Sequence, residues 1–83
     1  MSYDIVLSLD AVEDVLRITM ASQAKVSIIT ASQQIQDALR HEPRDAGQHL
    51  SEGLYFVDRE PLRAFFTVSD DEATVEIVNV RAL

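Results

Sequence analysis

The chain has 83 residues, which is enough for one domain and too few for two. Hydrophobic residues make up 47% and charged residues 25%, so the chain is expected to fold around one core. The absence of cysteine excludes disulfides, thiolate metal ligands and thiol nucleophiles. A net charge of −7 argues against direct binding to nucleic acid, because a negative field repels phosphates, and favours a protein partner.

The amino terminus lacks the features of a secretion or membrane signal. Residues 1–4 contain no basic region followed by a long apolar run. The longest apolar stretches are far shorter than the roughly 20 residues needed to cross a bilayer. A cytoplasmic location without membrane contact is therefore the expectation.

The first quarter of the chain predicts a strand followed by a helix. Residues 3–7 alternate in the way that a half-buried strand does. The helix after them is capped either by Asp10, in a capping box with Glu13, or by Ser8. Spacings of three and four residues predict its core-facing stripe, composed of Val12, Val15, Leu16, Thr19 and Met20.

A second helical pattern follows a weaker stretch at residues 21–25. Because no glycine or proline enforces a break, residues 12–40 are expected to form either two helices or one bent helix. Helical geometry should end by residues 41–42, since the residue before Pro43 disfavours it. The predicted buried stripe of this segment consists of Ile28, Ala31, Ile35, Ala38 and Leu39.

The second half of the chain predicts extended structure. Pro43–Gly53 is expected to be a polar connection in which only Leu50 is anchored. Three runs rich in strand formers follow, at residues 54–57, 62–68 and 74–80. Short turns join them, which predicts an antiparallel meander.

These elements predict an α+β domain over residues 1–83, in the order β-α-α-β-β-β. Both helices must bury an apolar stripe, and the meander must bury one face. The expected arrangement is a helical hairpin packed on one face of a small, mainly antiparallel sheet that the first strand also joins.

The order of the predicted elements and several short sequence motifs resemble those of the RelE/ParE superfamily of toxins. Residues 3–14 resemble its first strand and helix, His41–Pro43 its connection after the second helix, residues 61–71 its arginine-bearing strand, and residues 75–81 its last strand. The resemblance implies the toxin of a type II toxin–antitoxin system, bound by a cognate antitoxin-like protein. Such toxins inhibit growth through ribosome-dependent mRNA cleavage or through gyrase.

The resemblance also suggests a catalytic site without metal or cofactor. Arg63 matches the strand arginine that stabilises the phosphate undergoing cleavage in the ribonucleases, and Arg81 lies where a later basic residue often occurs. Arg59 is the third candidate, if all three converge on one sheet face as a cationic clamp. The alternative is a purely structural role, in which these arginines form surface salt bridges with neighbours such as Asp58, Glu60 and Glu76.

Several departures from the family pattern support a second hypothesis. The strand before Arg63 carries Asp58 where basic residues are usual, and the chain is acidic. The alternative function is therefore a catalytically inactive protein-binding module that kept the fold. A third hypothesis is a homo-oligomer that uses an exposed edge strand or helix face.

The remaining polar residues are expected to be structural. His41 and His49 are interpreted as solvated loop residues rather than acid–base catalysts or metal ligands. Residues 70–72 are interpreted as an acidic hairpin turn rather than a cation site, because they lack spaced oxygen ligands.

Overall fold

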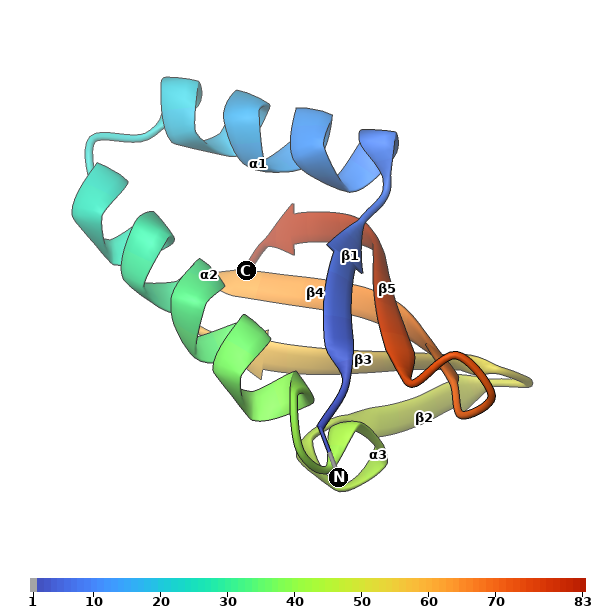
Figure 1. Ribbon diagram of the computed structural model, residues 1–83. Coiled ribbons are helices and arrows are strands. Elements are labelled where there is room, and N and C mark those ends of the chain that lie inside the picture. Colours follow the sequence, from blue (N-terminus) through green and yellow to red (C-terminus); the bar gives the residue numbers. More distant parts are fainter. Residues whose placement is uncertain (1) are drawn as a thin grey trace.

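The structure is a computed structural model that describes residues 2–83. Its helices and strands follow one another in the order shown in Figure 1. They are β1 (Asp4–Leu7), α1 (Leu9–Ala21), α2 (Lys25–Leu39), α3 (Pro43–Ala46), β2 (Gln48–Ser51), β3 (Leu54–Arg59), β4 (Leu62–Ser69) and β5 (Thr74–Ala82).

The strands form one sheet in the order β1-β5-β4-β3-β2. β1 pairs with β5 in parallel, and the other neighbours are antiparallel. α1 packs on β5, whereas α2 packs on β3 and β4, so both helices cover one face, which is called here the inner face (Figure 1). The predicted α+β fold, with a helical hairpin on one face of a mainly antiparallel sheet, is confirmed. Across residues 2–83, every helix is too short or too polar to span a lipid bilayer.

The connection at Pro43–Gly53 was predicted wrongly, because it contains α3 and the edge strand β2. Leu50, the expected anchor, is 51% exposed, whereas Pro43 is buried and Ala46 packs against the core. All four residues of β2 are exposed, so the segment has no buried alternation to reveal it. Its strand geometry comes from pairing with β3.

Gly47 allows β2 to approach the sheet. A Cβ atom at this position would lie 2.6 Å from the Phe66 ring and 2.8 Å from the Phe56 carbonyl oxygen. Real Cβ atoms do not come that close to ring or backbone atoms, so only glycine fits here without a shift. The chain can then enter β2, where Gln48 pairs with Phe56.

The two-helix alternative and the Ser8 cap are both confirmed. The Ser8 hydroxyl oxygen accepts a hydrogen bond from the Ala11 amide at 3.1 Å, which satisfies one orphan donor of the first turn. At the far end, the Lys25 ammonium donates to the carbonyl oxygens of Thr19 (2.9 Å) and Ser22 (2.7 Å). A cation on the last carbonyl groups stabilises this helix end, where α1 stops before α2 begins.

The stripe predicted for α1 is largely the wrong one. Ala11 is fully buried, and Val15 and Ile18 pack against the core, whereas Val12, Leu16 and Met20 are exposed. Both sets satisfy spacings of three and four residues, so periodicity alone did not distinguish them. The α2 prediction is confirmed for Ile28, Ala31, Ile35 and Leu39, which are buried, whereas Ala38 is only half-buried.

A β-bulge interrupts the pairing of β4 with β5. Phe65 pairs with Asn79 and Phe66 with Ile77, so Val78 is one extra residue on β5. The start of α1 satisfies the backbone groups near this bulge. The Ser8 hydroxyl donates to the Val78 carbonyl oxygen at 2.8 Å.

The same helix anchors the next residues of β5. The Asp14 carboxylate accepts from the Val80 amide at 2.9 Å. Because one residue is added at Val78, the side-chain alternation changes phase: Val80 is buried, while Asn79 and Arg81 lie on the outer face.

Candidate functional site on the outer face of the sheet

Arg63 and Arg81 lie side by side on the outer face, the face that the helices do not cover. They are Cα partners in the pairing of β4 with β5. Arg63 alternates with buried Leu62 and Ala64, so its side chain points away from the core. Arg81 reaches the same face only because of the bulge at Val78. Two of the three predicted cations therefore converge.

Each of these guanidinium groups stacks on an aromatic ring. The Arg63 Cζ atom lies 4.5 Å from the ring centre of Phe56, and the Arg81 Cζ atom lies 5.6 Å from that of Phe65. The two rings are neighbours, with centres 6.4 Å apart. Cation–π attraction holds the guanidinium groups against the sheet and keeps their edges exposed to solvent.

Arg63 forms a bidentate salt bridge with Asp58. Its Nε atom donates to one carboxylate oxygen at 2.6 Å and its Nη2 atom to the other at 2.8 Å. This guanidinium lowers the pKa of the Asp58 carboxyl, and the carboxylate in turn raises the pKa of Arg63. The fork that would hold a phosphate is thus occupied by a carboxylate of the same chain.

Arg81 has a different environment. Among residues 2–83, no carboxylate lies within salt-bridge distance of it. Its side chain borders a hollow of about 320 Å³ on the outer face. The other residues that line this hollow are Leu50, Leu54, Phe65, Val78 and Asn79. An anion can therefore approach Arg81 without first displacing a bound carboxylate.

Arg59 does not join the other two arginines. It follows outward-facing Asp58 in β3, so alternation turns it toward the inner face. Its guanidinium donates to the carbonyl oxygen of Asp58 at 2.7 Å. The expected three-arginine clamp is therefore reduced to a pair, Arg63 and Arg81.

The two histidines lie away from this pair. His41 is in the turn after α2, as expected of a loop residue, but His49 lies in β2 rather than in a loop. The His49 ring is edge-on to Tyr55, with centres 5.4 Å apart. In the part of the chain that the structure describes, no three His, Asp or Glu side chains are grouped for metal binding.

Asp70 has a structural role in the turn before β5. It accepts from the Tyr3 hydroxyl at 2.9 Å and from both Nη atoms of Arg44, at 3.0 and 3.1 Å. Arg44 first and Tyr3 second lower the pKa of this carboxyl. The interpretation of residues 70–72 as a hairpin turn is correct, since Asp70–Ala73 connect β4 and β5.

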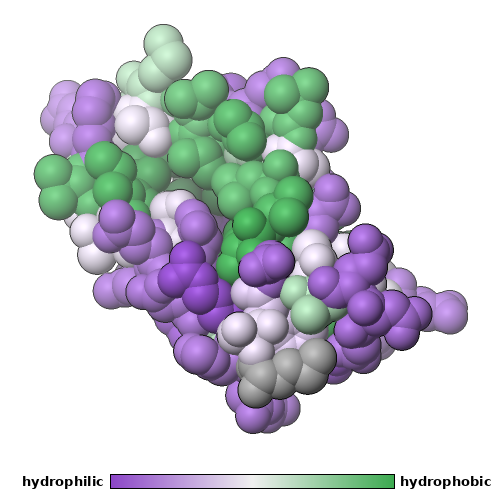
Figure 2. All heavy atoms as spheres, viewed as in Figure 1, coloured by the Kyte–Doolittle hydropathy of each residue, from purple (hydrophilic) through white to green (hydrophobic). Residues whose placement is uncertain are grey.

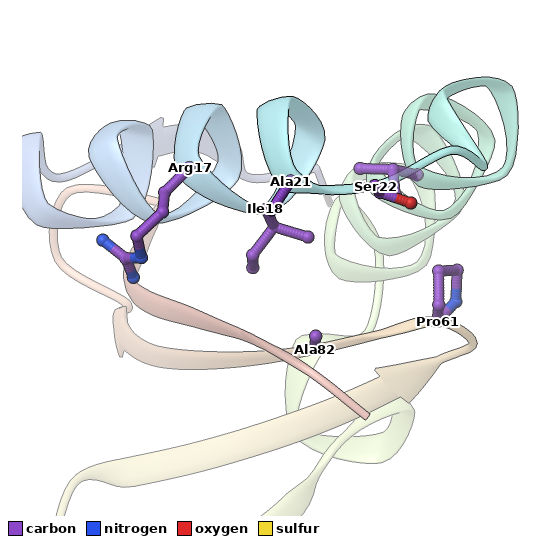
Figure 3. Close-up of a pocket in the computed structure, with 7 residues that line it drawn as sticks. Arg17, Ile18, Ala21, Ser22, Pro61 and Ala82 are labelled. Carbon is purple, nitrogen blue, oxygen red and sulfur yellow. The ribbon is translucent and has the colours of Figure 1, made fainter.

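A second cavity, of about 480 Å³, lies beneath the end of α1 (Figure 3). Arg17 is its one charged lining residue and is already paired with Asp14 at 2.7 Å. The cavity thus lacks the converging polar groups of a catalytic site. Its other lining residues are Ile18, Ala21, Ser22, Ile28, Pro61 and Ala82.

The sequence suggested Arg63 and Arg81 as candidates but gave no sign of the hollow beside them. Leu50, Val78 and Asn79 meet there because β2 forms and because β5 is bulged. Neither feature has a clear sequence signal here.

Comparisons with known proteins show similarity in structure and not in sequence. The sequence matches no protein-family model and has no significant match among curated proteins. A chain of the toxin–antitoxin complex RelBE2 from Mycobacterium tuberculosis is 21% identical, with a TM-score of 0.81, and the alignment covers 100% of both chains.

Two further structures support the same fold. A chain of the RelE–RelB complex from Pyrococcus horikoshii has a TM-score of 0.70 at 14% identity, with coverage of 99% of this chain and 96% of that one. A chain of the ParDE system from P. aeruginosa has a TM-score of 0.64 at 16% identity, covering 99% and 97%. The fold expected from the RelE/ParE resemblance is therefore confirmed over the full length.

Proposed function

We propose that this chain is the toxin of a type II toxin–antitoxin pair, that it acts in the cytoplasm, and that a cognate antitoxin-like protein silences it. One observation carries the proposal: a chain with the fold of RelE and ParE structures presents Arg63 and Arg81 together on its open sheet face. Fold likeness alone does not determine function, so the arginine pair is the part that experiment must test.

The proposed activity is growth inhibition through ribosome-dependent mRNA cleavage or through gyrase. Cleavage by attack of a 2′-hydroxyl builds negative charge on the phosphate, and two adjacent guanidinium groups stabilise such charge without a metal. Arg81 offers an unpaired fork for this purpose, whereas Arg63 must first exchange Asp58 for the phosphate. Because the chain carries a net charge of −7, the ribosome or another protein would have to bring the RNA to this face.

The second candidate is a binding module without catalysis, and the Asp58–Arg63 pair favours it. A bidentate carboxylate is a stable occupant of a guanidinium fork. With Arg63 occupied and Arg59 on the other face, one open cation remains at the site. In this alternative, the outer face recognises a protein partner and cleaves nothing.

The test is growth after induction of the chain in a bacterium that lacks the cognate partner. Native protein should arrest growth, and Arg63→Ala and Arg81→Ala should each relieve the arrest. Arg40→Ala is the matched control, since Arg40 is an exposed arginine of the α2 end paired with Asp37. It should arrest growth as the native chain does.

Normal growth at a verified level of folded native protein would contradict the toxin proposal and favour the binding module. Arrest that persists in both Arg63→Ala and Arg81→Ala would place the working residues elsewhere. If growth stops, mRNA cleavage in a translating extract and supercoiling by purified gyrase distinguish the two targets. Cleavage should persist when EDTA is kept below the Mg²⁺ concentration that the ribosomes need, because under these conditions EDTA removes transition metals, which this site is not expected to use.

A further inference from the structure

The chain has two exposed apolar surfaces outside its core. Figure 2 shows hydrophobic residues gathered over the half of the molecule that carries α1, where Leu9, Leu16 and Met20 are exposed. The other surface is the outer face of the sheet, which the helices leave uncovered (Figure 1). The outer face also carries charges of both signs at defined positions, and these charges specify what can bind there.

Two hollows adjoin along β4 and β5 on the outer face. The first, of about 320 Å³, is the one that Arg81 borders. β4 contributes Phe65 to the first hollow and Thr67 to the second, so the hollows are neighbours, with these two residues about 7 Å apart along the strand. The second hollow, of about 260 Å³, is lined by Val6, Thr67, Ser69, Glu72, Thr74 and Glu76.

The two hollows have opposite charge. Arg81 borders the first, whereas Glu72 and Glu76 border the second. Among residues 2–83, none of these three side chains has a salt-bridge partner. Their charges are therefore available to another molecule. The outer face is cationic toward the end of β5 and anionic near its start, and a complementary partner must have the opposite polarity.

The first hollow also supplies apolar contact on a concave surface. β2 and β5 are separated by β3 and β4 in the sheet, yet Leu50 of β2 and Val78 of β5 line the same hollow. The sheet is therefore concave on this side and fits the convex surface of a helix. A helix satisfies its own backbone hydrogen bonds, which a sheet face cannot do for it, because strand hydrogen bonds lie within the sheet.

We propose that the outer face docks an amphipathic helix of a partner protein, with an acidic residue at one end of its buried side and a basic residue at the other. The acidic side chain binds Arg81, apolar side chains fill the first hollow, and the basic side chain binds between Glu72 and Glu76. Glu76 and Arg81 are separated by roughly 13–17 Å along β5, allowing for the bulge at Val78. Eleven residues of helix rise roughly 16 Å and return to the same side.

The net charge of the chain and its local charges have different effects on such a partner. A net charge of −7 attracts a segment that is basic overall and speeds its encounter with the chain. Arg81 opposes that trend at one point, so it determines the direction in which the helix lies. A helix in the reverse direction would place its basic residue against Arg81 and its acidic residue against Glu76, and both contacts would be repulsive.

Synthetic peptides with this charge pattern test the proposal. The probe is an alanine-rich helix with one glutamate, two leucines on the same side, and one lysine eleven residues after the glutamate. Two matched peptides carry glutamate at both positions or lysine at both. NMR titration in about 0.15 M salt, which screens the net charge, should show the tightest binding for the mixed peptide at up to about 1 mM. The amide signals of Asn79 and Glu76 should shift.

Charge reversal in the protein identifies the contacts. Arg81→Glu should weaken binding of the mixed peptide at least several-fold and strengthen binding of the two-lysine peptide, because attraction and repulsion exchange places. Glu76→Arg should do the same with the two-glutamate peptide. Arg40→Glu is the matched control, since Arg40 is an exposed arginine at the end of α2. It should leave the preference for the mixed peptide unchanged. Circular dichroism verifies that each variant is folded.

Three results would overturn the proposal. The first is no binding of the mixed peptide, and the second is equal binding of the mixed and two-lysine peptides. The third is binding of a short single-stranded RNA to this face by a chain that does not bind the mixed peptide, which would assign the hollows to nucleic acid. The titration measures binding and not growth, so its outcome is independent of the toxin proposal.

Discussion

The two faces of the sheet come from the same strands but differ in what organises them. Phe66 and Phe65 are consecutive in β4, yet Phe66 is fully buried on the inner face and Phe65 is partly exposed on the outer one. Phe66 stacks on Tyr55 with ring centres 5.6 Å apart, within the apolar core. Phe65 instead supports the guanidinium of Arg81.

The inner face therefore contributes most of the stability, whereas the outer face carries the charged side chains of the candidate site. The inner face removes large apolar side chains from water, which is the dominant favourable term in folding. The outer face leaves Arg63, Asp58 and Arg81 in contact with solvent, where ionic interactions contribute little to stability. Substitutions on the two faces should therefore have different consequences.

Truncation of the two neighbouring phenylalanines is the largest expected difference. Phe66→Ala should lower the free energy of unfolding by about 3–5 kcal/mol, because it leaves a cavity in the core. Phe65→Ala should cost only about 1 kcal/mol, the value typical of an aromatic contact. Urea unfolding of both variants measures the difference. Equal losses would mean that the outer face supports the fold as much as the inner face does.

Removal of the Asp14 carboxylate should have the next largest effect. Its side chain is 14% exposed and accepts hydrogen bonds from the Val80 amide (2.9 Å) and from Arg17 (2.7 Å). Asp14→Ala should therefore cost about 1–3 kcal/mol, because it leaves the Val80 amide without its partner. Asp37→Ala is the control, since Asp37 forms the same kind of pair with Arg40 but is 71% exposed. It should change stability much less.

The Asp14 contribution should also depend on pH. The Val80 amide above all, together with Arg17 and Asn79, lowers the pKa of this carboxyl in the folded chain. A lowered folded pKa means stabilisation above the unfolded value of about 3.9, lost as the pH falls through the folded value. The stability difference between native chain and Asp14→Ala should thus be constant near pH 7 and shrink below about pH 4. A difference that grows on acidification would contradict this assignment.

The inner face was largely predictable from the sequence, and the outer face was not. Most of the α2 stripe from Ile28 to Leu39 was recognised, because burial imposes the helical period on the residues. The failure at α1 has the same physical origin, since its two apolar stripes have equal periodicity. A monomer buries one of them, and the sequence does not say which.

The position of Arg81 shows why the site was harder to predict than the core. Simple alternation from Ile77 would place residue 81 on the inner face. The bulge at Val78 reverses this, and contacts from Ser8 and Asp14, far away in the sequence, satisfy its backbone groups. Such a tertiary cause leaves no local pattern, whereas Arg63 needs no bulge, because it alternates with buried Leu62 and Ala64 in β4.

Among these substitutions, replacement of Asp58 should have the smallest effect on stability. It tests directly whether the outer face binds anions. Asp58→Asn keeps the side-chain shape but removes the charge that occupies the Arg63 fork. Because the Asp58 and Arg63 side chains are both more than one-third exposed, the free energy of unfolding in urea should change less than in Asp14→Ala. Titration with inorganic phosphate, followed by the NMR signal of the Arg63 Nε–H group, should show binding in Asp58→Asn at concentrations where the native chain shows none.

Arg81 is the internal reference for this titration. In the native chain, phosphate should perturb the side-chain signals of Arg81 before those of Arg63, because only Arg63 has a carboxylate to displace. In Asp58→Asn the two arginines should respond together, since they are neighbours across β4 and β5 and each rests on an aromatic ring. If Arg63 stays silent even without the Asp58 charge, its fork is not an anion site, and the outer face is better explained as a surface for a protein partner.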